Sequence, residues 1–381
     1  MNFELTEEQA AIQEMALSFA KERLAPNAEE WDETGHFPLD VLREAGGLGM
    51  GAMFVAEENG GSGLGRLDGA IIFEALSYGC PVIASYLSIH NMVVGMVGRF
   101  GSGEQRAAWM AKLSSLEWAS CYCLTEPGSG SDAAALKTRA DRDGDHYVLN
   151  GSKQFISGAG AADFYLVMVR TGGEGPAGIS TVIAEKDTPG LSFGGLEKKM
   201  GWNAQPTRTV NFDNARIPVG NRLGAEGDGF KFAMMGLDGG RINIAACSIG
   251  AAQSAFDKAV AYMEERKAFG SALSEFQGLQ FKVADMATEL EASRLMVYRA
   301  AAALDRADPH ATKYCAMAKR YATDACFAVA NDALQIHGGY GYLQDYGIEK
   351  IVRDLRVHQI LEGTNEIMRL IVARKVLGPG N

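Results

Sequence analysis

The hydrophobic pattern of this chain changes its period twice, and that change limits the folds that the chain can adopt. Apolar residues recur at helical spacing up to about residue 116, and short β-rich runs replace them from about 117 to 227. From about 228 to 381 the helical period returns. This order predicts an α+β protein with a helical domain at 1–116, a β domain at 117–227 and a second helical domain at 228–381.

The N-terminal domain is expected to contain several short helices. Thr6 and Gln9 have the spacing of a capping box, in which the Thr hydroxyl accepts a hydrogen bond from a free backbone N–H of the first turn. Further helical patterns, separated by glycine-rich breaks, cover 38–46, 68–79, 81–100 and 103–113.

The middle domain is expected to be antiparallel, because its β-rich runs are short and no helical pattern lies between them. Asn150-Gly151 separates two of these runs and is a strong signal for a two-residue hairpin turn. The runs cover 119–124, 147–149, 154–157, 164–169, 179–184 and 209–212. In the C-terminal domain, a four-helix bundle is predicted from long amphipathic stretches at 249–267, 276–307 and 309–336.

The composition argues against several kinds of partner and site. Thirty-six basic and 47 acidic residues give a net charge of −11, which argues against binding to nucleic acid or to an anionic membrane surface. A phosphate group would have to be held by helix N-termini and single arginines. The six cysteines are scattered and the six histidines form no metal-binding motif, so we expect neither a disulfide framework nor a metal site.

The chain also lacks the marks of membrane insertion and of export. No run of eighteen apolar residues occurs, so no membrane span is expected. The N-terminal sequence MNFELTEEQAA is acidic and helix-like, unlike a signal peptide or an arginine-rich transit peptide. We therefore expect the protein in the bacterial cytoplasm, or in the mitochondrial matrix as a mature form.

Four segments could carry chemistry, and each also has a plain structural interpretation. The segment 125–132 (TEPGSGSD) is either a loop of turn formers or a nest of backbone N–H groups for an electron-rich ring or a phosphate. Residues 266–270 (RKAFG) and 335–339 (QIHGG) close helices, either as caps or as contacts to a ring and a pyrophosphate. Glu362 is either a solvated loop carboxylate or a general base whose pKa is raised by an apolar wall.

In this order and at these distances, TEPGSGSD, RKAFG, QIHGG and EGTNEIMR resemble the acyl-CoA dehydrogenase family, over essentially the whole chain. The resemblance implies the family's fold and its reaction, the α,β-dehydrogenation of an acyl-CoA thioester by FAD. Glu362 matches the catalytic base of most of the family. Two branches carry the base at the position of Gly240 instead, and glycine cannot act as a base.

The resemblance also implies which residues of the middle domain contact FAD. A loop and a strand are expected to lie against the isoalloxazine ring, and the strand supplies a serine hydroxyl near flavin N5. These residues are Tyr122, Cys123, Leu124, Thr125, Gly130 and Ser131 in the loop, and Phe155, Ile156 and Ser157 in the strand.

Other matched positions concern the neighbouring subunit, the adenosine half of FAD and the substrate. Thr364, Asn365 and Glu366 match residues near the adenosine, although the family often has Gln in place of Glu366. The residues expected to contact the acyl-CoA are Ser131, Asp238, Gly239, Gly240, Arg241 and Arg374. The set that matches contacts to a neighbour's FAD, and so implies a homotetramer, is Arg266, Phe269, Phe276, Gln277, Gln335, Ile336, His337, Gly338 and Gly339.

Within the family, stretches such as NGSKQFISGAG, GWNAQPTR and GGRINIAACS are most similar to the branch that oxidises isobutyryl-CoA to methacryloyl-CoA in valine breakdown. Electron-transferring flavoprotein would then accept the electrons. Butyryl-CoA and 2-methylbutyryl-CoA are the alternative substrates. A flavin oxidase and a DNA-associated relative are more distant alternatives. Nitroalkane oxidases use Asp as the base, whereas this chain has Glu362. The DNA-associated branch carries a basic C-terminal extension, whereas this sequence stops at Gly380-Asn381.

Overall fold

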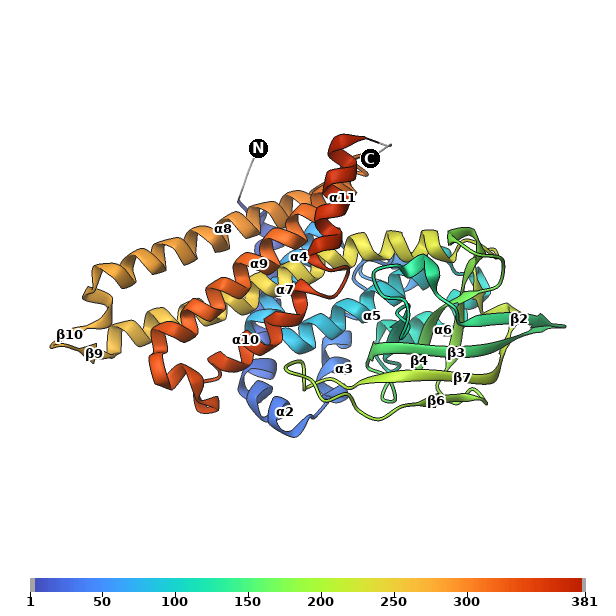
Figure 1. Cartoon of the computed structure of the whole chain (residues 1–381), viewed down its shortest axis with the longest axis horizontal. Coiled ribbons are helices and arrows are strands. Elements are labelled where there is room, and N and C mark those ends of the chain that lie inside the picture. The colour runs from blue at the N-terminus through green and yellow to red at the C-terminus, as the bar shows by residue number, and fades with distance from the viewer. Residues whose placement is uncertain (1–3, 379–381) are drawn as a thin grey trace.

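The computed structural model describes residues 4–378 as three packed parts, with the sheet at one end of the molecule and long helices at the other (Figure 1). The N-terminal part is helical, as predicted. The predicted capping box starts the first helix, because Thr6 Oγ1 accepts a hydrogen bond from Gln9 N and Gln9 Oε1 accepts one from Thr6 N, both at 3.2 Å. The helices are α1 (Glu7–Phe19), α2 (Ala28–Thr34), α3 (Leu39–Gly47), α4 (Arg66–Gly79), α5 (Pro81–Phe100) and α6 (Gly103–Ser114).

The middle part is an eight-stranded sheet in the order β6-β7-β3-β2-β4-β5-β8, with β1 paired to β4. Most neighbours are antiparallel, as predicted, but β2 pairs in parallel with β4 at Arg139 and Arg170, and β1 runs parallel to β4. The chain between these two strands includes β2 and β3, which supplies the length that a parallel connection requires. The strands are β1 (Ser120–Cys123), β2 (Arg139–Asp143), β3 (His146–Ser157), β4 (Phe164–Arg170), β5 (Ile179–Glu185), β6 (Leu191–Phe193), β7 (Thr207–Pro218) and β8 (Arg222–Leu223).

The hairpin turn predicted at Asn150-Gly151 is wrong. Both residues lie inside β3, where the register to β7 shifts between Leu149 and Gly151, as in a β-bulge. Gly151 has φ +147°, and a Cβ at this position would lie 2.6 Å from Thr138 Oγ1. The glycine therefore serves the bulge and the close approach of Thr138, and the local sequence pattern shows neither.

The real turn lies between β2 and β3. Asp143 pairs with His146, so Gly144 and Asp145 form a two-residue loop. Gly144 has φ +62°, the left-handed conformation that such a loop demands. The Gly144-Asp145 pair is thus the hairpin signal that applies here.

The C-terminal part forms the predicted bundle, with three long helices lying side by side (Figure 1). The shorter α11 packs on α9 as the fourth member, and α10 also contacts α9. A small hairpin of β9 (Lys267–Ala268) and β10 (Ser271–Ala272) joins the first two long helices. The helices are α7 (Gly229–Glu265), α8 (Gln277–Asp305), α9 (Ala311–His337), α10 (Ile348–Arg356) and α11 (Asn365–Leu377).

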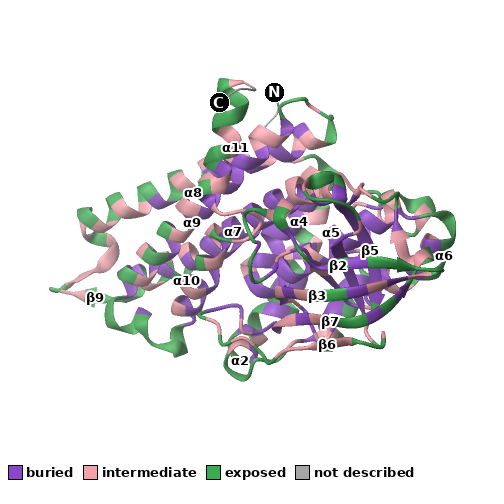
Figure 2. Ribbon diagram, turned by 45° about the vertical axis from the view of Figure 1, so that its right-hand side comes forward, coloured by how far each residue is buried: buried purple, intermediate pink, exposed green. Residues whose placement is uncertain are grey.

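Helices α4, α5 and α7 form the buried centre of the molecule (Figure 2). Gly250 lets α7 approach α4 closely, because a Cβ there would collide with the carbonyl of Glu74. By length and composition α5 could cross a membrane, and it is the only helix of residues 4–378 that could. However, 83% of its most apolar window is buried inside the molecule, so α5 is a core helix.

Helix α10 connects all three parts. Arg353 donates a hydrogen bond to Asp32 Oδ2 of α2 at 2.7 Å and another to Met200 O at 3.2 Å. The buried Asp354 accepts a hydrogen bond from Trp202 N at 2.6 Å and pairs with Lys350 at 2.6 Å. The segment that precedes β7 is therefore fixed to the C-terminal bundle.

Candidate active site

Glu362 lies in the short loop between a 3₁₀ turn, Val357–Gln359, and α11. Glu362 and Gly363 both have left-handed backbone conformations, with φ +57° and +92°. Two cations hold this loop: Arg241 Nε donates to Glu362 O at 3.2 Å and Lys319 Nζ donates to Gly363 O at 2.9 Å. A left-handed non-glycine residue persists only where its surroundings impose it. These two hydrogen bonds help to impose it here.

The Glu362 carboxylate faces α7 at Gly240. A Cβ built on Gly240 would lie 2.6 Å from Glu362 Oε2, so any side chain at position 240 would displace the carboxylate. Oε2 is buried and has no hydrogen-bond partner within residues 4–378. An unpaired buried carboxylate oxygen costs free energy. This atom is therefore available to a ligand or a proton.

Burial raises the pKa of Glu362 to about 7, against the opposing effects of the Arg241 and Lys319 charges. Lys319 is itself fully buried, which lowers its pKa to about 8. The Glu362 carboxyl group thus titrates near neutral pH. Such a group is well suited to take up and release a proton.

Tyr122, on strand β1 of the sheet, lies near the Glu362 carboxylate. Its hydroxyl is buried, and the described residues offer it no hydrogen-bond partner. Burial raises the pKa of Tyr122, and the nearby negative charge of Glu362 raises it further, so the phenol stays protonated. One unpaired polar group from β1 and one from the loop before α11 therefore lie close enough to interact.

The residues expected to contact acyl-CoA on α7 lie beside this carboxylate. Arg241 Nη1 pairs with Asp238 Oδ1 at 2.7 Å, and Asp238 Oδ2 accepts a hydrogen bond from Thr312 Oγ1 at 2.7 Å. Gly239 is buried against Arg66, whose Nη1 would lie 2.5 Å from an added Cβ. The other two expected contacts lie at the surface: Ser131 in the loop after β1 and Arg374 in the last turn of α11.

Thr364, Asn365 and Glu366 start α11 and differ in exposure. The Thr364 side chain is the N-cap and accepts a hydrogen bond from Ile367 N at 3.3 Å. The buried Asn365 side chain accepts from Lys319 Nζ at 2.9 Å and donates to Asp324 Oδ1 at 2.6 Å, so it serves the fold of the loop. The Glu366 side chain is 81% exposed.

The second set of expected FAD contacts lies at the far end of the bundle, around the β9–β10 hairpin and the end of α9 (Figure 1). Gly240 and Arg266 are separated by 26 residues of α7 and its C-cap. At 1.5 Å per residue this is about 39 Å. Residues near Arg266 therefore cannot touch a ligand that lies against Glu362 of the same chain.

Aromatic rings gather at this far end. The Arg266 guanidinium lies 5.4 Å from the centre of the Tyr340 ring, and His337 stacks on Tyr262 at 4.4 Å. Phe269 and Gly270 both have positive φ and form the tip of the β9–β10 hairpin, where Phe269 is 99% exposed. Of the other expected contacts here, Ile336 is buried, Phe276 is half-buried, and the exposed ones are Gln277, Gln335, Gly338 and Gly339.

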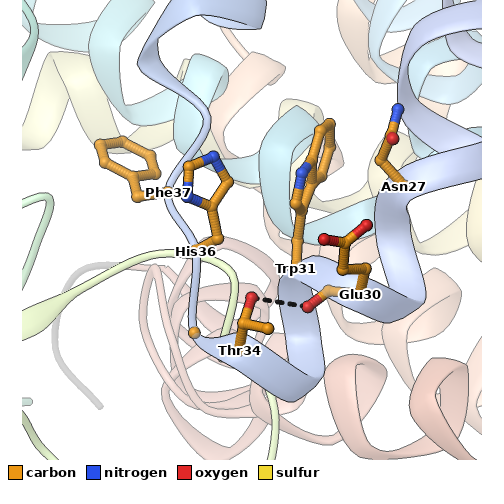
Figure 3. A pocket seen from close by; sticks show the side chains of 7 residues that line it. Asn27, Glu30, Trp31, Thr34, His36 and Phe37 are labelled. Carbon is orange, nitrogen blue, oxygen red and sulfur yellow. Dashed lines mark hydrogen bonds between the residues drawn. The ribbon is translucent and has the colours of Figure 1, made fainter.

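Two surface pockets are lined by other residues. The first, of about 580 Å³, sits beside α2, where Thr34 Oγ1 donates to Glu30 O at 2.7 Å (Figure 3). It is lined by Asn27, Glu30, Trp31, Thr34, Gly35, His36 and Phe37. The second, of about 620 Å³, lies between α8, α9 and α11. Neither pocket contains a residue expected from the sequence to bind substrate or cofactor.

Three family models together match almost the whole chain. The acyl-CoA dehydrogenase N-terminal domain matches residues 6–117, the middle domain 121–215 and the C-terminal domain 227–377. The chain belongs to the acyl-CoA dehydrogenase family. Members of this family are FAD-dependent oxidoreductases that act on CH–CH bonds.

Individual relatives agree with this assignment. The mitochondrial isobutyryl-CoA dehydrogenase of Dictyostelium discoideum is 56% identical over 373 residues, which are 98% of this chain and 90% of that protein. The structure of butyryl-CoA dehydrogenase from Megasphaera elsdenii superposes with a TM-score of 0.96 at 37% identity, covering 99% of this chain and 100% of the other. A structure of the FAD complex of PigA superposes with a TM-score of 0.95 at 30% identity and covers 99% of both chains.

The residues of this acyl-CoA dehydrogenase fit an FAD in contact with the middle domain. Gly128 and Gly130 have no atom within 4 Å of an added Cβ and no positive φ, so nothing within the described chain requires glycine there. A ligand that approaches the backbone would require it. On β3, Phe155 has φ +59° and is 65% exposed, so its ring is free to contact a flavin. The unpaired Tyr122 hydroxyl lies on the neighbouring part of the sheet.

Several residues that shape this acyl-CoA dehydrogenase site were missed by the sequence reasoning. The Glu126 carboxylate accepts hydrogen bonds from Thr138 N at 2.9 Å and from the buried Lys153 Nζ at 2.7 Å, which anchors the 125–132 loop to β3. Gln205 Nε2 donates to Ser157 Oγ at 3.2 Å. The only signal for these residues was their place inside polar stretches flanked by glycine or proline.

Proposed function

We propose that this chain oxidises isobutyryl-CoA to methacryloyl-CoA, with Glu362 as the catalytic base. One observation carries the proposal: Glu362 Oε2 is buried and unpaired within the described residues, the carboxylate faces the bare backbone of Gly240, and its pKa is raised to about 7. A carboxylate in this state removes a proton better than an ordinary solvated glutamate.

The base step needs two kinds of help from the chain. The α-proton of a thioester is a far weaker acid than a carboxylic acid, so the negative charge that develops on the thioester oxygen must be stabilised in a dry site. Within residues 4–378 the backbone N–H of Glu362 donates no hydrogen bond, so it can donate to that oxygen. FAD, when bound, supplies the chemistry that accepts the β-hydride.

Arg241 and Lys319 keep the Glu362 carboxyl group able to ionise and so to act as a base. Their positive charges oppose the effect of burial on the Glu362 pKa, so the carboxyl group still ionises near neutral pH. Their hydrogen bonds to Glu362 O and Gly363 O also fix the loop. Arg241 is in turn held by Asp238, which turns the guanidinium toward the loop. The base therefore stays oriented before the substrate arrives.

FAD is proposed to lie against the middle part of the molecule, between the end of β3 and the segment Tyr122–Ser131. Phe155, Ile156 and Ser157 would contact the isoalloxazine ring, and Tyr122–Ser131 would enclose it from the loop side. Gln205 fixes the Ser157 hydroxyl through its hydrogen bond at 3.2 Å. The far cluster, from Arg266 to Gly339, would complete the FAD site of a neighbouring subunit, because it lies about 39 Å from Gly240 along α7. This arrangement supports a homotetramer.

The choice of isobutyryl-CoA rests on the similarity to isobutyryl-CoA dehydrogenases and on the room near the base. A substrate branched at Cα carries an extra methyl group at the carbon between base and flavin. Gly240 offers no side chain there, and Leu361 precedes the base. Butyryl-CoA is the second candidate, because the butyryl-CoA dehydrogenase structure superposes over the whole chain.

Steady-state kinetics with four substrates test the substrate. One methyl group in an apolar site is worth roughly 10- to 200-fold in kcat/KM. We expect isobutyryl-CoA to lead, butyryl-CoA and 2-methylbutyryl-CoA to follow, and octanoyl-CoA to be poor. A tenfold lead for butyryl-CoA or 2-methylbutyryl-CoA would reject isobutyryl-CoA as the main substrate while leaving the family assignment intact.

The electron acceptor and the setting complete the proposal. Electron-transferring flavoprotein would reoxidise the reduced enzyme, and slow reoxidation by air after anaerobic reduction would distinguish this acceptor from oxygen. The reaction would be a step of valine breakdown, in the bacterial cytoplasm or the mitochondrial matrix. The net charge of −11 gives no support to a nucleic-acid partner, and an electrophoretic shift assay at low salt tests for one.

A further inference from the structure

One face of α7 runs past the catalytic carboxylate into the buried centre. Gly236, Gly240, Asn243 and Cys247 are spaced by four, three and four residues, so they share this face. Gly240 faces Glu362. Asn243 follows three residues later, which is about 4.5 Å further along the helix axis.

Helix α5 covers this face in the opposite direction. A Cβ on Gly236 would contact Met92 and Met96, near the end of α5, whereas Cys247 interacts with the hydroxyl of Ser85, near its start. The two helices are therefore antiparallel where they touch. Position 243 lies between these two contacts and must face α5 between residues 85 and 92.

Ser88 is the residue of α5 that this register sets opposite Asn243. It lies on the same face of α5 as Ser85 and Met92, at spacings of three and four residues. Ser88 is fully buried and Asn243 is 1% exposed. Ser88 Oγ and both polar atoms of the Asn243 side chain have no hydrogen-bond partner in the described part of the chain.

These groups lie where the acyl end of the substrate is expected. Along α7, Asp238 comes before Gly240 and is expected to contact the CoA side of the substrate. The reacting carbons lie at Gly240, so the acyl group continues toward Asn243. An apolar chain that reached Asn243 would keep any hydrogen-bonding partner away from this buried, unpaired amide, and that is unfavourable.

We propose that Asn243, with Ser88, forms a polar stop that restricts this enzyme to short acyl groups. The inference rests on the proposed function and adds the residues that set chain length. A four-carbon isobutyryl group ends before the stop, so its binding requires no contact with these unpaired polar atoms. Each further methylene would lie against the amide. Chain-length selectivity is thus set by polarity as well as by volume.

The test compares substrates of increasing length in two variants at position 243. Asn243→Leu keeps the size of the side chain and removes its polarity, whereas Asn243→Ala removes both. We expect both variants to raise the ratio of kcat/KM for hexanoyl-CoA over isobutyryl-CoA, by roughly 10-fold or more. Equilibrium binding of both acyl-CoAs to the same variants in a Glu362→Gln background should show the same change in the ratio of Kd values.

Ser88→Ala gives an independent arm that keeps the helix intact, and we expect a smaller change in the same direction. Ser293→Ala is its matched control, because Ser293 on α8 is also fully buried with an unpaired hydroxyl in the described chain but lies away from this face. Relaxation in Asn243→Ala alone would overturn the proposal, since volume would then be the barrier. So would unchanged ratios in every variant of an enzyme that oxidises isobutyryl-CoA. Failure of the wild type to oxidise any acyl-CoA would instead reject the proposed function.

Discussion

The two ends of the C-terminal bundle carry opposite kinds of surface. Near Gly240, the two cations are buried and hydrogen-bonded within the chain: Arg241 to Asp238, and Lys319 to the loop at Gly363. At the β9–β10 end many residues are exposed (Figure 2), and large apolar side chains are among them. Phe269 is 99% exposed and Tyr342 is 83% exposed.

This difference between the two ends of the bundle indicates which part of the proposed site is complete within one chain. The loop of Glu362, the proposed base, is held by contacts inside the same chain, so the position of this residue needs no second subunit. The exposed rings have no such partners, and contiguous exposed apolar groups mark interaction surfaces. Changes at the two ends should therefore separate the reaction from the retention of cofactor.

The largest effect is expected at the base. Glu362→Gln keeps the shape of the side chain and removes its ability to accept a proton. Flavin reduction by isobutyryl-CoA should slow roughly 10³- to 10⁴-fold, the usual upper range for loss of a general base. Stopped-flow absorbance of the anaerobic holoenzyme measures this, with the exposed Glu117→Gln as a control. Bleaching at a near-normal rate would reject Glu362 as the base.

Lys319→Met should have the next largest effect and a clear pH signature. The change removes a positive charge near Glu362 and leaves Gly363 O and the Asn365 side chain without their bonds at 2.9 Å. Without that charge the pKa of Glu362 rises above about 7. Because the base must be ionised, the acid limb of the kcat/KM profile should move to higher pH, with a rate loss of roughly 10- to 100-fold at pH 7.

Lys319→Arg is the matched control for this shift. It keeps the positive charge among the groups that face Lys319, which are Glu362, Arg241, Asp324 and Glu366. It should therefore keep the acid limb near its original position, even where the bulkier side chain lowers the rate. An acid limb that stays in place in Lys319→Met would show that the lysine only holds the loop.

Phe269→Ser tests the exposed end. Since Phe269 makes little contact within its own chain, its loss should leave the fold of the single chain unchanged. If the hairpin contacts a neighbour's FAD, the variant should retain FAD about tenfold less tightly and shift toward smaller assemblies. Flavin absorbance after dialysis and light scattering measure these two effects. Leu48→Ser, at an exposed residue of the N-terminal part, is the control.

Much of this site was predictable because its signals are contiguous in sequence. The loop before α11 carries Glu362 next to a helix cap, and the 125–132 loop carries glycines that nothing else in the chain requires. The helical periods likewise predicted the N-terminal and C-terminal parts. Local patterns failed where a distant residue sets the geometry, as at Gly151, whose bulge follows from the approach of Thr138.

The positioning residues could not be predicted for the same reason. Lys319 and Gly363 are 44 residues apart, and Gln205 and Ser157 are 48 apart. Each pair forms only when separate elements pack, and a lysine or glutamine within a polar stretch looks like a solvated side chain. Sequence reasoning pointed to Glu362 as the candidate base, whereas only the fold showed which residues hold its loop.

The smallest effect is expected at Glu366, which lies in the first turn of α11, close in sequence to the base but pointing to solvent. Its side chain is 81% exposed, and its ion pair with Arg369 is long, at 3.8 Å. The pKa of Glu366 is lowered chiefly by the backbone N–H at the start of the helix, which any polar side chain can use. Glu366→Gln keeps that hydrogen bond and should change kcat/KM and FAD retention by less than about twofold. A tenfold loss of FAD in this variant, with normal flavin reduction in the enzyme that remains loaded, would show that the start of α11 belongs with the exposed end of the bundle in binding cofactor.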